Sequence, residues 1–434
     1  MAAGRAFAAP RPAPESAHSG SVDVAIVGAG AAGIAAARRV AAAGKHFVLL
    51  EAANESGGRC VTDTTSFGVP YDRGAHWIYS ADINPLARLA TRSGLDLYPA
   101  PPGQRVRIGK RYAREGEMED FLAGLVRVNT AIADVARKSD VACSQALPKD
   151  LGEWRSSIEF ASGPYPFGKD LAELSTVDMA RAAERDNSVF CRQGFGALLA
   201  KLGAGLPLQA ATPVTRIGWG RPMVEVETAR GVFSARTVIV TASTGVLNAG
   251  KIKFGPDLPR RHLDAIAKLK LGSHDHVALE LAGNPLDLRA DELVFEKSES
   301  GKTAAIFANV AGSALCTVDV GGSFGRDLSA KGEAAMIGFA VDWLGGLYGA
   351  DMKKAVKRKH ATRWNEEPWV LGATSAAAPG AQSARKIMME PLNNRVFFAG
   401  EAAHETLWGT VGGAWESGER AAAAALNVVG GGRR

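Results

Sequence analysis

Near its start the chain alternates between apolar runs and a glycine-rich turn. Val22 to Val27 form a short apolar run, an alanine-rich stretch extends to Ala43, and a second apolar run from His46 to Leu50 ends in Glu51. The two runs have the length and composition of buried strands, and the alanine-rich stretch has those of a helix. This order predicts a βαβ unit of about thirty residues, with the glycine-rich turn between its first strand and its helix.

The middle of the chain changes its period twice. From Leu86 to about Phe190 the pattern is helical, and a helix with one apolar face is predicted by residues that recur at three- and four-residue steps, namely Phe121, Leu125, Val128, Ile132 and Val135. From about Gly194 the pattern favours strands. We expect a hairpin, a buried strand and a second sheet from the segments Met223 to Thr228 with Val232 to Ser234, Thr237 to Thr241, and Val277 to Leu281 with Ala304 to Ala308 and Cys316 to Val320.

The end of the chain returns to the pattern of its beginning. A helix is predicted between about Ala330 and Leu347, followed by a strand from Arg395 to Ala399, a glycine-rich turn and a C-terminal helix from about Gly413 to Leu426. Elements typical of a nucleotide-binding domain therefore stand at the start, middle and end, with two other segments inserted between them. We expect an α/β fold.

Length and composition narrow the class of protein. The chain has 434 residues, of which 46% are hydrophobic and 22% charged, and this excludes a disordered chain, a collagen and a coiled coil. Domains usually run about 100 to 200 residues, so two domains are expected. No stretch reaches the roughly 18 apolar residues of a membrane span. The composition predicts a soluble globular protein without a membrane partner.

The charge and the cysteines add little chemistry. The net charge is +6, and the dense basic run Lys353 to Lys359 has helical spacing, so we interpret it as the solvated face of a helix rather than a nucleic-acid patch. The four cysteines form no CxxC pair, which suggests neither a zinc site nor a disulfide framework.

The first twenty residues are small and proline-rich, and we expect a disordered tail there. They contain no apolar core of a secretory signal, so a cytoplasmic location is expected. Ala6-Phe7-Ala8 nevertheless resembles the remnant of a cleavage site, which leaves a periplasmic location open.

The glycine-rich turn itself has the spacing Gly28-x-Gly30-x-x-Gly33. Glycine permits a tight turn and lets the backbone approach a pyrophosphate, while the helix N-terminus presents N–H groups to it. Glu51 ends the next strand at the distance expected of an acid that accepts ribose hydroxyls. A merely tight structural turn is the alternative, but the strand–turn–helix context favours dinucleotide binding.

Motifs beyond this turn make the chain recognisable. Glu51-Ala52 with Gly57-Gly58-Arg59, and then Asp72-x-Gly74-Ala75-His76-Trp77, resemble the flavin-containing amine oxidases, the family of the monoamine and polyamine oxidases. Phe398-Ala399-Gly400-Glu401 and Gly409-Thr410-Val411 near the C-terminus resemble the closing motif of that family. The resemblance spans about residues 22 to 425.

The resemblance implies a Rossmann-type FAD-binding domain of residues 21–85, 194–260 and 386–430, with an inserted α+β substrate-binding domain of residues 86–193 and 261–385. It implies that Glu401 holds the ribityl chain, that Val214 meets the adenine and that Thr410 and Val411 lie beside the flavin. For the C-terminal glycines, simple helix-start geometry is an equally good explanation. The cofactor-binding residues expected in total are Gly28, Gly30, Ala31, Ala32, Gly33, Glu51, Ala52, Gly57, Gly58, Arg59, Gly74, Ala75, His76, Trp77, Val214, Trp369, Gly400, Glu401, Thr410, Val411 and Ala414.

One departure from the family pattern concerns the catalytic position. Family members commonly place a lysine near flavin N5, and matching Leu271-Gly272-Ser273 puts His276 there. A histidine that is neutral near its reference pKa of about 6.5 can hold a water, so it could keep the role with a different pH dependence. A strand histidine that only fills space is the alternative. His274 and His276 also form a metal-like pair, but no third ligand is evident.

A second departure concerns the two aromatic rings that flank the amine in several members. Thr374 and Thr410 occupy those places, so the cage is missing or is built from Tyr79, Trp369 or Trp408, although such aromatics are more often core than pocket. We expect Tyr79, Thr374 and Trp408 in the substrate pocket. Ala373 stands where covalently flavinylated members carry cysteine, which predicts non-covalent FAD.

The resemblance implies an FAD-dependent oxidation of an amine to an imine, with hydride transfer to flavin N5, hydrolysis of the imine, and reoxidation by O2 or an electron carrier. Some polyamine oxidases carry an acid just after the motif tryptophan, where this chain has Ile78-Tyr79-Ser80, so a monoamine is the expected substrate. A flavin oxidase or desaturase that acts on a non-amine, and a catalytically silent FAD-binding module, remain alternatives. A homodimer is left open.

Overall fold

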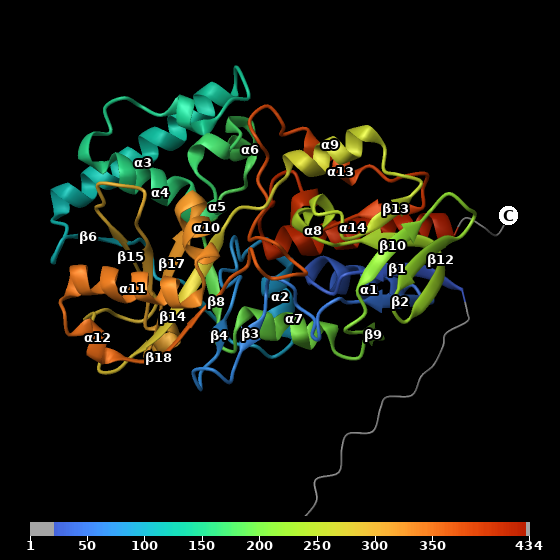
Figure 1. The fold of residues 1–434 in the computed structure, drawn as a ribbon, viewed down its shortest axis with the longest axis horizontal. Helices are drawn as coiled ribbons and strands as arrows, with labels where there is room; N and C mark the ends of the chain where they lie inside the picture. Colours follow the sequence, from blue (N-terminus) through green and yellow to red (C-terminus); the bar gives the residue numbers. More distant parts are fainter. Residues whose placement is uncertain (1–20, 431–434) are drawn as a thin grey trace, which may run out of the picture.

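The protein is described by a computed structural model that covers residues 21–430; the expected N-terminal tail lies outside these residues. Two large sheets stand next to each other, one in each half of the molecule (Figure 1). The first contains β1 (Val22–Val27), β2 (Phe47–Leu50), β9 (Leu208–Gln209), β10 (Val214–Gly218), β11 (Val224–Thr228), β12 (Gly231–Val240), β13 (Lys253–Gly255) and β19 (Val396–Phe398). The second contains β6 (Arg105–Ile108), β7 (Arg111–Tyr112), β14 (His274–Leu281), β15 (Glu292–Glu296), β16 (Ala305–Ala308), β17 (Leu315–Gly321) and β18 (Val356–Ala361).

The helices cover both sheets, and two small strand pairs lie between them. The helices are α1 (Ala31–Ala42), α2 (Pro85–Arg92), α3 (Glu115–Ala136), α4 (Arg155–Ser162), α5 (Pro164–Phe167), α6 (Thr176–Arg181), α7 (Phe195–Gly203), α8 (Thr244–Asn248), α9 (Arg260–Lys268), α10 (Gly322–Ala330), α11 (Glu333–Tyr348), α12 (Met352–Ala355), α13 (Ala384–Met389) and α14 (Val411–Gly430). The small pairs are β3 (Thr62–Asp63) with β4 (Tyr71–Asp72), and β5 (Leu97–Pro99) with β8 (Val189–Cys191).

The centre of the first sheet is parallel and buried on both faces. β1 pairs in parallel with β2 and β12, and β19 pairs in parallel with β12. Val24 and Ile26 pack toward α1 and α14, whereas Ala25 and Val27 pack toward α8, α9 and α13. A strand that is covered on both faces requires an unbroken apolar run, and the buried part of β1, Val24 to Val27, is such a run; Asp23 lies at the less buried start of the strand.

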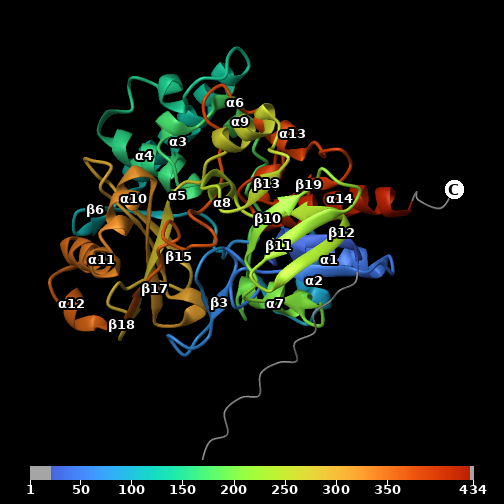
Figure 2. The same cartoon turned by 45° about the vertical axis from the view of Figure 1, so that its right-hand side comes forward.

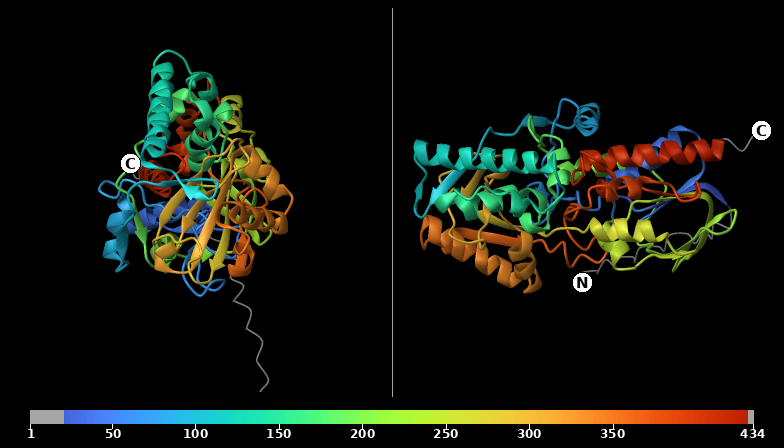
Figure 3. Two further views of the ribbon diagram at one scale, coloured as in Figure 1. Left: turned by 90° about the vertical axis from the view of Figure 1, so that its left-hand side faces the viewer. Right: turned by 90° about the horizontal axis from the view of Figure 1, so that it is seen from above.

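Close packing of α1 against α14 depends on small residues. A Cβ on Gly418 would lie 2.1 Å from the carbonyl oxygen of Ala32, so the two helices could not keep their present distance with a larger residue there. Turning the molecule brings the β10–β12 strands to the front of the first half (Figure 2). Seen from above, α14 and α3 run along the same side of the molecule, one over each half (Figure 3).

The second sheet has one apolar core on each face. Val277, Leu279 and Val318 pack with residues of α11, and Phe295 packs with Phe121 of α3. The alternation of side chains along β14 places Asp275 and Val277, both 0% exposed, on one face and the two β14 histidines on the other. Both sheets together confirm the α/β prediction.

Three predicted elements differ in the structure. The segment from Leu86 to Phe190 is not helical throughout, because β6 leaves it to pair in parallel with β15 and extend the second sheet. The predicted hairpin arm and buried strand are one continuous strand, β12. The basic run Lys353 to Lys359 is divided between α12 and the edge strand β18, where lysines discourage further strand pairing. Within residues 21–430, no helix is long and apolar enough to cross a membrane.

Candidate active site

A single cavity of about 880 Å³ extends between the first and the second sheet. Its walls include the β1–α1 turn and the end of β2 on one side, and β14 and β17 of the second sheet on the other. In open parallel sheets, ligands bind beyond the carboxyl ends of the strands, where this cavity lies. Its volume is in the range of sites for large organic ligands.

The glycine turn between β1 and α1 lines this cavity. Two of its glycines are required by the protein itself: Gly28 has φ +99°, and a Cβ on Gly33 would lie 1.8 Å from the carbonyl oxygen of Gly28. Gly30 differs, because the nearest protein atom to a Cβ there is 3.7 Å away. The N-terminus of α1 begins at Gly30 without a side-chain cap. The turn thus leaves its N–H groups and the space at Gly30 to a ligand, and it fits a pyrophosphate.

Glu51, at the end of β2, fits the ribose of the same dinucleotide. Its carboxylate accepts hydrogen bonds from the Ala29 N–H at 2.6 Å and the Ala53 N–H at 2.8 Å. Burial raises the pKa of Glu51, and these N–H groups partly offset that rise. Each oxygen keeps a further lone pair, and the residue lines the cavity, so it can accept a ribose hydroxyl as well.

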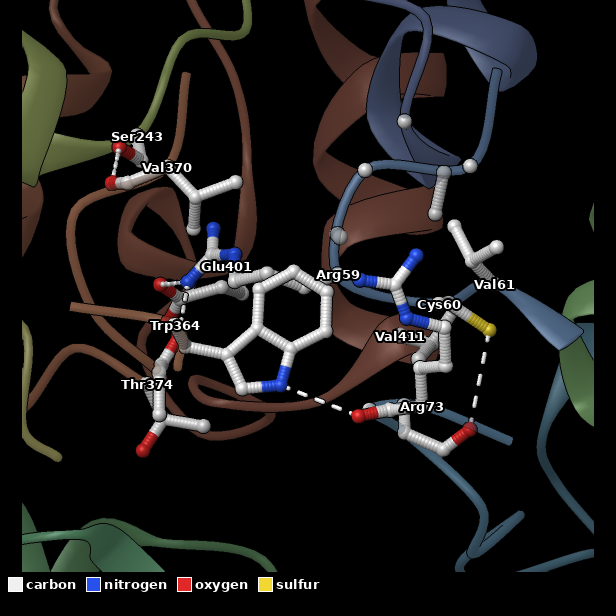
Figure 4. Close-up of a pocket in the computed structure, with 18 of the residues that line it drawn as sticks. Arg59, Cys60, Val61, Arg73, Ser243, Trp364, Val370, Thr374, Glu401 and Val411 are labelled. Atoms are coloured by element: carbon white, nitrogen blue, oxygen red, sulfur yellow. Dashed lines mark hydrogen bonds and ion pairs between the residues drawn. The ribbon is translucent and has the colours of Figure 1, made fainter. Parts of the chain in front are cut away.

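Glu401 and Arg59 join three loops that are far apart in sequence (Figure 4). Arg59 Nη1 donates to Glu401 Oε1 at 2.8 Å and to the Ala373 carbonyl at 2.5 Å. Glu401 Oε2 accepts from Ser375 Oγ at 2.6 Å and from the Gly409 N–H at 3.0 Å. Burial opposes ionisation of Glu401, yet Arg59 and Ser375 hold its pKa below the usual value. The carboxylate is therefore a fixed anion that sets the positions of the surrounding loops.

Trp364 and Gly74 form a flat part of the wall. The Trp364 indole N–H donates to the Arg73 carbonyl at 3.1 Å, and Figure 4 shows the ring inside the pocket. A Cβ on Gly74 would lie 2.2 Å from the Arg59 carbonyl oxygen and 3.0 Å from the Trp364 ring. Glycine is therefore needed at position 74 for the packing of the protein itself, and the surface it leaves suits a planar ring system.

His276 is fixed at both ring nitrogens. Nδ1 lies 2.7 Å from Asp319 Oδ1, and Nε2 lies 3.2 Å from the carbonyl oxygen of Gly74. Both partners can only accept when Asp319 is ionised, so both nitrogens must donate and the ring is an imidazolium. Burial lowers the pKa of His276, but Asp319 and the Gly74 carbonyl outweigh it, and the net shift is upward. The structure thus favours a cation where the sequence predicted a neutral ring.

Asp319 was missed by the sequence reasoning, and it also completes the metal-like pair. β14 and β17 are antiparallel with His276 opposite Asp319, so that His274, His276 and Asp319 have their ligand atoms within 4.8 Å of one another. Burial and the neighbouring His276 lower the pKa of His274 to about 4. The hydrogen bonds of His276 account for its orientation without a metal ion. The signal in the sequence was an aspartate within the apolar run of β17.

The remaining wall is aromatic, with one cation among the rings. Phe295, Phe307, Tyr79 and Tyr165 line it. Arg185, which no sequence motif had marked, also lines it, 5.1 Å from the centroid of the Tyr79 ring. Trp369 also lines the cavity, but its side chain is 38% exposed, and Lys251 Nζ lies 5.3 Å from the centroid of its ring.

The cavity brings together nearly all of the predicted site residues, including His276, Tyr79 and Thr374. Three predicted residues do not line it. Trp408 is 1% exposed and packs against Phe167 at 5.1 Å between ring centroids, so it belongs to the core. Gly33 packs behind the glycine turn, and the Gly400 N–H donates to Ser417 Oγ at 2.8 Å behind the wall.

Comparison with known proteins gives two family matches. The family model of flavin-containing amine oxidoreductases matches residues 149–426, and that of the NAD(P)-binding Rossmann-like domain matches residues 26–92. Human lysine-specific histone demethylase 2 is 26% identical over 94% of this chain and 54% of its own length. Probable polyamine oxidase 4 of Arabidopsis thaliana is 26% identical over 91% of this chain and 85% of its length. The chain spans about half the length of the histone demethylases it matches.

Solved structures share the fold. Cyclohexylamine oxidase from Brevibacterium oxydans superposes with a TM-score of 0.77 at 20% identity, covering 94% of this chain and 99% of that one. Wild-type putrescine oxidase bound to putrescine superposes with a TM-score of 0.79 at 19% identity and the same coverage. The comparisons agree with a Rossmann-like domain that carries a second, mixed sheet.

Proposed function

The chain belongs to the flavin-containing amine oxidoreductases, and we propose that it binds FAD non-covalently and oxidises an amine to an imine that water hydrolyses. The glycine turn between β1 and α1 and Glu51 form a cradle for a dinucleotide at the first sheet. The observation that carries this proposal is that one cavity joins this cradle to the aromatic wall at the second sheet. A cofactor in the cradle and a substrate at the wall would therefore share one enclosed space.

The residues of the cradle fit FAD in kind and position. The α1 N-terminus with Gly30 would hold the pyrophosphate, Glu51 would hold a ribose, and the wall of Gly74 and Trp364 would face the flat ring system. When bound, the flavin would supply an acceptor for two electrons and the α-hydrogen of the substrate; the amine nitrogen would lose a proton as the C=N bond forms. O2 or an electron carrier would take up the electrons afterwards.

The chain contributes position, charge and exclusion of water. The aromatic side chains of Phe295, Phe307 and Trp77 form the apolar part of the wall at the substrate end of the cavity, the end next to the second sheet. The imidazolium of His276, held by Asp319, stands at this wall and supports a role in place of the family's lysine. Neither of its ring nitrogens is free for a water in this arrangement, so we propose that it acts through its charge and its exchangeable proton.

The non-covalent attachment rests on Ala373, which lines the cavity where a cysteine would form a thioether. Its carbonyl holds Arg59, but its methyl group offers no nucleophile. Acid precipitation of the holoenzyme should therefore release the flavin into the supernatant.

We also propose that polyamines are poor substrates, although some relatives are named for them. A second ammonium needs a carboxylate that is free to receive it, and three carboxylates of the cavity wall already have cationic or imidazole partners: Asp72 bonds His76, Asp319 bonds His276, and Glu401 bonds Arg59. Faster turnover of spermidine than of simple monoamines would overturn this choice.

An anaerobic panel of amines tests the proposed function. A substrate should bleach the flavin absorbance of the holoenzyme in stoichiometric amount. Photoreduction provides the control, because a catalytically silent module would bleach with light and with no amine. Bleaching by apolar non-amines alone would instead favour the desaturase alternative.

A further inference from the structure

Arg185 places a positive charge at the substrate end of the cavity. It lies in the loop after α6 and lines the cavity, with its guanidinium 4.7 Å from the centroid of the Phe167 ring and 5.1 Å from that of Tyr79. Nη1 donates to the Pro166 carbonyl at 3.2 Å, and Nη2 reaches the Trp408 carbonyl at 3.5 Å. These two bonds and a contact with the Tyr79 hydroxyl still leave about two of its five N–H donors without a protein acceptor.

No carboxylate neutralises this guanidinium among residues 21–430. Glu401 contributes to its electrostatic environment but is bonded to Arg59 at 2.8 Å, and Asp319 is bonded to His276 at 2.7 Å. An arginine does not lose its proton in a protein, so the charge persists. A charge withdrawn from bulk water is costly unless a partner compensates it, and the rings around Arg185 compensate only in part.

The guanidinium stands beside the two positions at which the family resemblance would place aromatic rings around the amine. Those places hold Thr374 and Thr410 here. A Cβ on Gly409 would lie 3.5 Å from Arg185 Nη2 and 3.6 Å from Thr374 Cβ, so the guanidinium and Thr374 flank the same point. Aromatic rings attract a cation, whereas a guanidinium attracts a planar anion. With a guanidinium and two threonines at these positions, this part of the cavity is suited to an anionic group.

We propose that Arg185 binds a carboxylate of the substrate, which makes the substrate an amino acid rather than a simple amine. The planar fork of N–H groups matches a carboxylate in a bidentate pair, and the incoming anion supplies the missing counter-charge. This inference rests on the proposed amine oxidation, which it narrows to a substrate class.

Matched pairs that differ only in the carboxylate test the inference. Phenylalanine is compared with 2-phenylethylamine, leucine with 3-methylbutylamine, and 6-aminohexanoate with hexylamine, by kcat/KM of the holoenzyme. We expect the carboxylate member to be preferred in at least one pair, and the pair that shows it reports the spacing between amine and carboxylate. Equal or better turnover of the plain amine in every pair overturns the inference.

Variants separate recognition from structure. Arg185→Gln should lower the preference for the carboxylate member about 30-fold or more, because one partner of an enclosed charge pair is lost. Arg185→Lys should retain part of it, since the charge remains but the fork does not. Arg192→Gln is the matched control: Arg192 also lies over a tyrosine ring, at 4.7 Å from Tyr98, but is exposed and outside the cavity wall. If Arg185→Gln lowers Tm and leaves the preference unchanged, Arg185 is only a structural cation among aromatic rings.

A non-oxidisable ligand keeps this test independent of turnover. Benzoate should bind the wild-type holoenzyme and the Arg192→Gln variant in calorimetry. Its Kd for Arg185→Gln should be about 30-fold higher, as for the loss of the carboxylate preference. Benzoate binding that depends on Arg185, together with no bleaching by any amine or amino acid, would refute amine oxidation and leave the carboxylate site standing. Bleaching by plain amines, with benzoate binding indifferent to Arg185, would refute the inference alone.

Discussion

Replacing Asp319 by asparagine should change the charge of His276 without changing the shape of the cavity. The carboxylate lies 2.7 Å from Nδ1, and the two side chains are only 7% and 16% exposed, so solvent screens the pair weakly. An opposite charge at this distance typically shifts a pKa by about 1 to 3 units. The pKa of His276 should therefore fall by about that amount in Asp319→Asn.

The energy of the pair follows from the same shift. A hydrogen bond to a charged group contributes about 1.5 to 3 kcal/mol, and we expect this loss from the free energy of unfolding of Asp319→Asn near pH 5.5. The folded pKa of His276 is raised, so its contribution is complete below about pH 6.5 and is lost as the pH rises through the folded pKa. Burial opposes ionisation of Asp319, but His276 lowers its pKa overall, so its contribution is present above about pH 4 and is lost as the pH falls through the folded value. The pair therefore stabilises most between about pH 4 and pH 6.5.

Chemical denaturation of the holoenzyme at pH 5.5 and pH 9 measures this dependence. The destabilisation by Asp319→Asn should be larger at pH 5.5, and the pH profile of flavin reduction should move toward lower pH by the change in pKa. Glu280→Gln is the control, because Glu280 lies on the same strand in an exposed pair with Arg358 at 2.6 Å. If Asp319→Asn lowered the free energy of unfolding equally at both pH values and left the pH profile of flavin reduction unchanged, His276 would not be held as a cation by Asp319.

Three further predictions concern the cofactor and the catalytic wall. Gly30→Leu should fold yet be isolated with little FAD, measured by the flavin-to-protein absorbance ratio, because a Cβ there meets no protein atom closer than 3.7 Å while the side chain would occupy the pyrophosphate site; full occupancy would remove Gly30 from the site. Gly33→Ala should instead lower Tm, since its Cβ would lie 1.8 Å from the Gly28 carbonyl oxygen. His276→Ala should slow anaerobic flavin reduction about tenfold or more with FAD still bound, and His276→Lys should restore part of the rate. If His276→Ala reduced its flavin at the wild-type rate at every pH, His276 would have only a packing role in β14.

The features that could be predicted from the sequence are those set by residues that are neighbours along the chain. The β1–α1 glycine turn and Glu51 at the end of β2 each follow from the order of neighbouring residues, and the structure places them accordingly. β6 was not predicted from the sequence, because its partner β15 is distant along the chain and only tertiary pairing makes this segment a strand. The basic run had helical spacing but lies partly in an edge strand, where pairing with β14 outweighs propensity.

The parts of the site that sequence could not supply depend on cross-strand register and on loops. Asp319 meets His276 only because β14 and β17 pair in one antiparallel register. Arg185 lies in a charged loop with no periodicity, and its position inside the cavity follows from contacts with Phe167 and Tyr79. Trp408 showed the reverse: an aromatic near the closing motif was expected in the pocket, but it packs against Phe167 in the core.

Anaerobic reduction of the bound flavin by amine substrates tests the central claim most directly. The holoenzyme is mixed with amines and amino acids in the absence of oxygen, and the flavin absorbance is followed in time. The account predicts stoichiometric bleaching by at least one of them, with release of ammonia or an amine and the corresponding carbonyl product. A flavin that light reduces normally but that no amine or amino acid bleaches would contradict it.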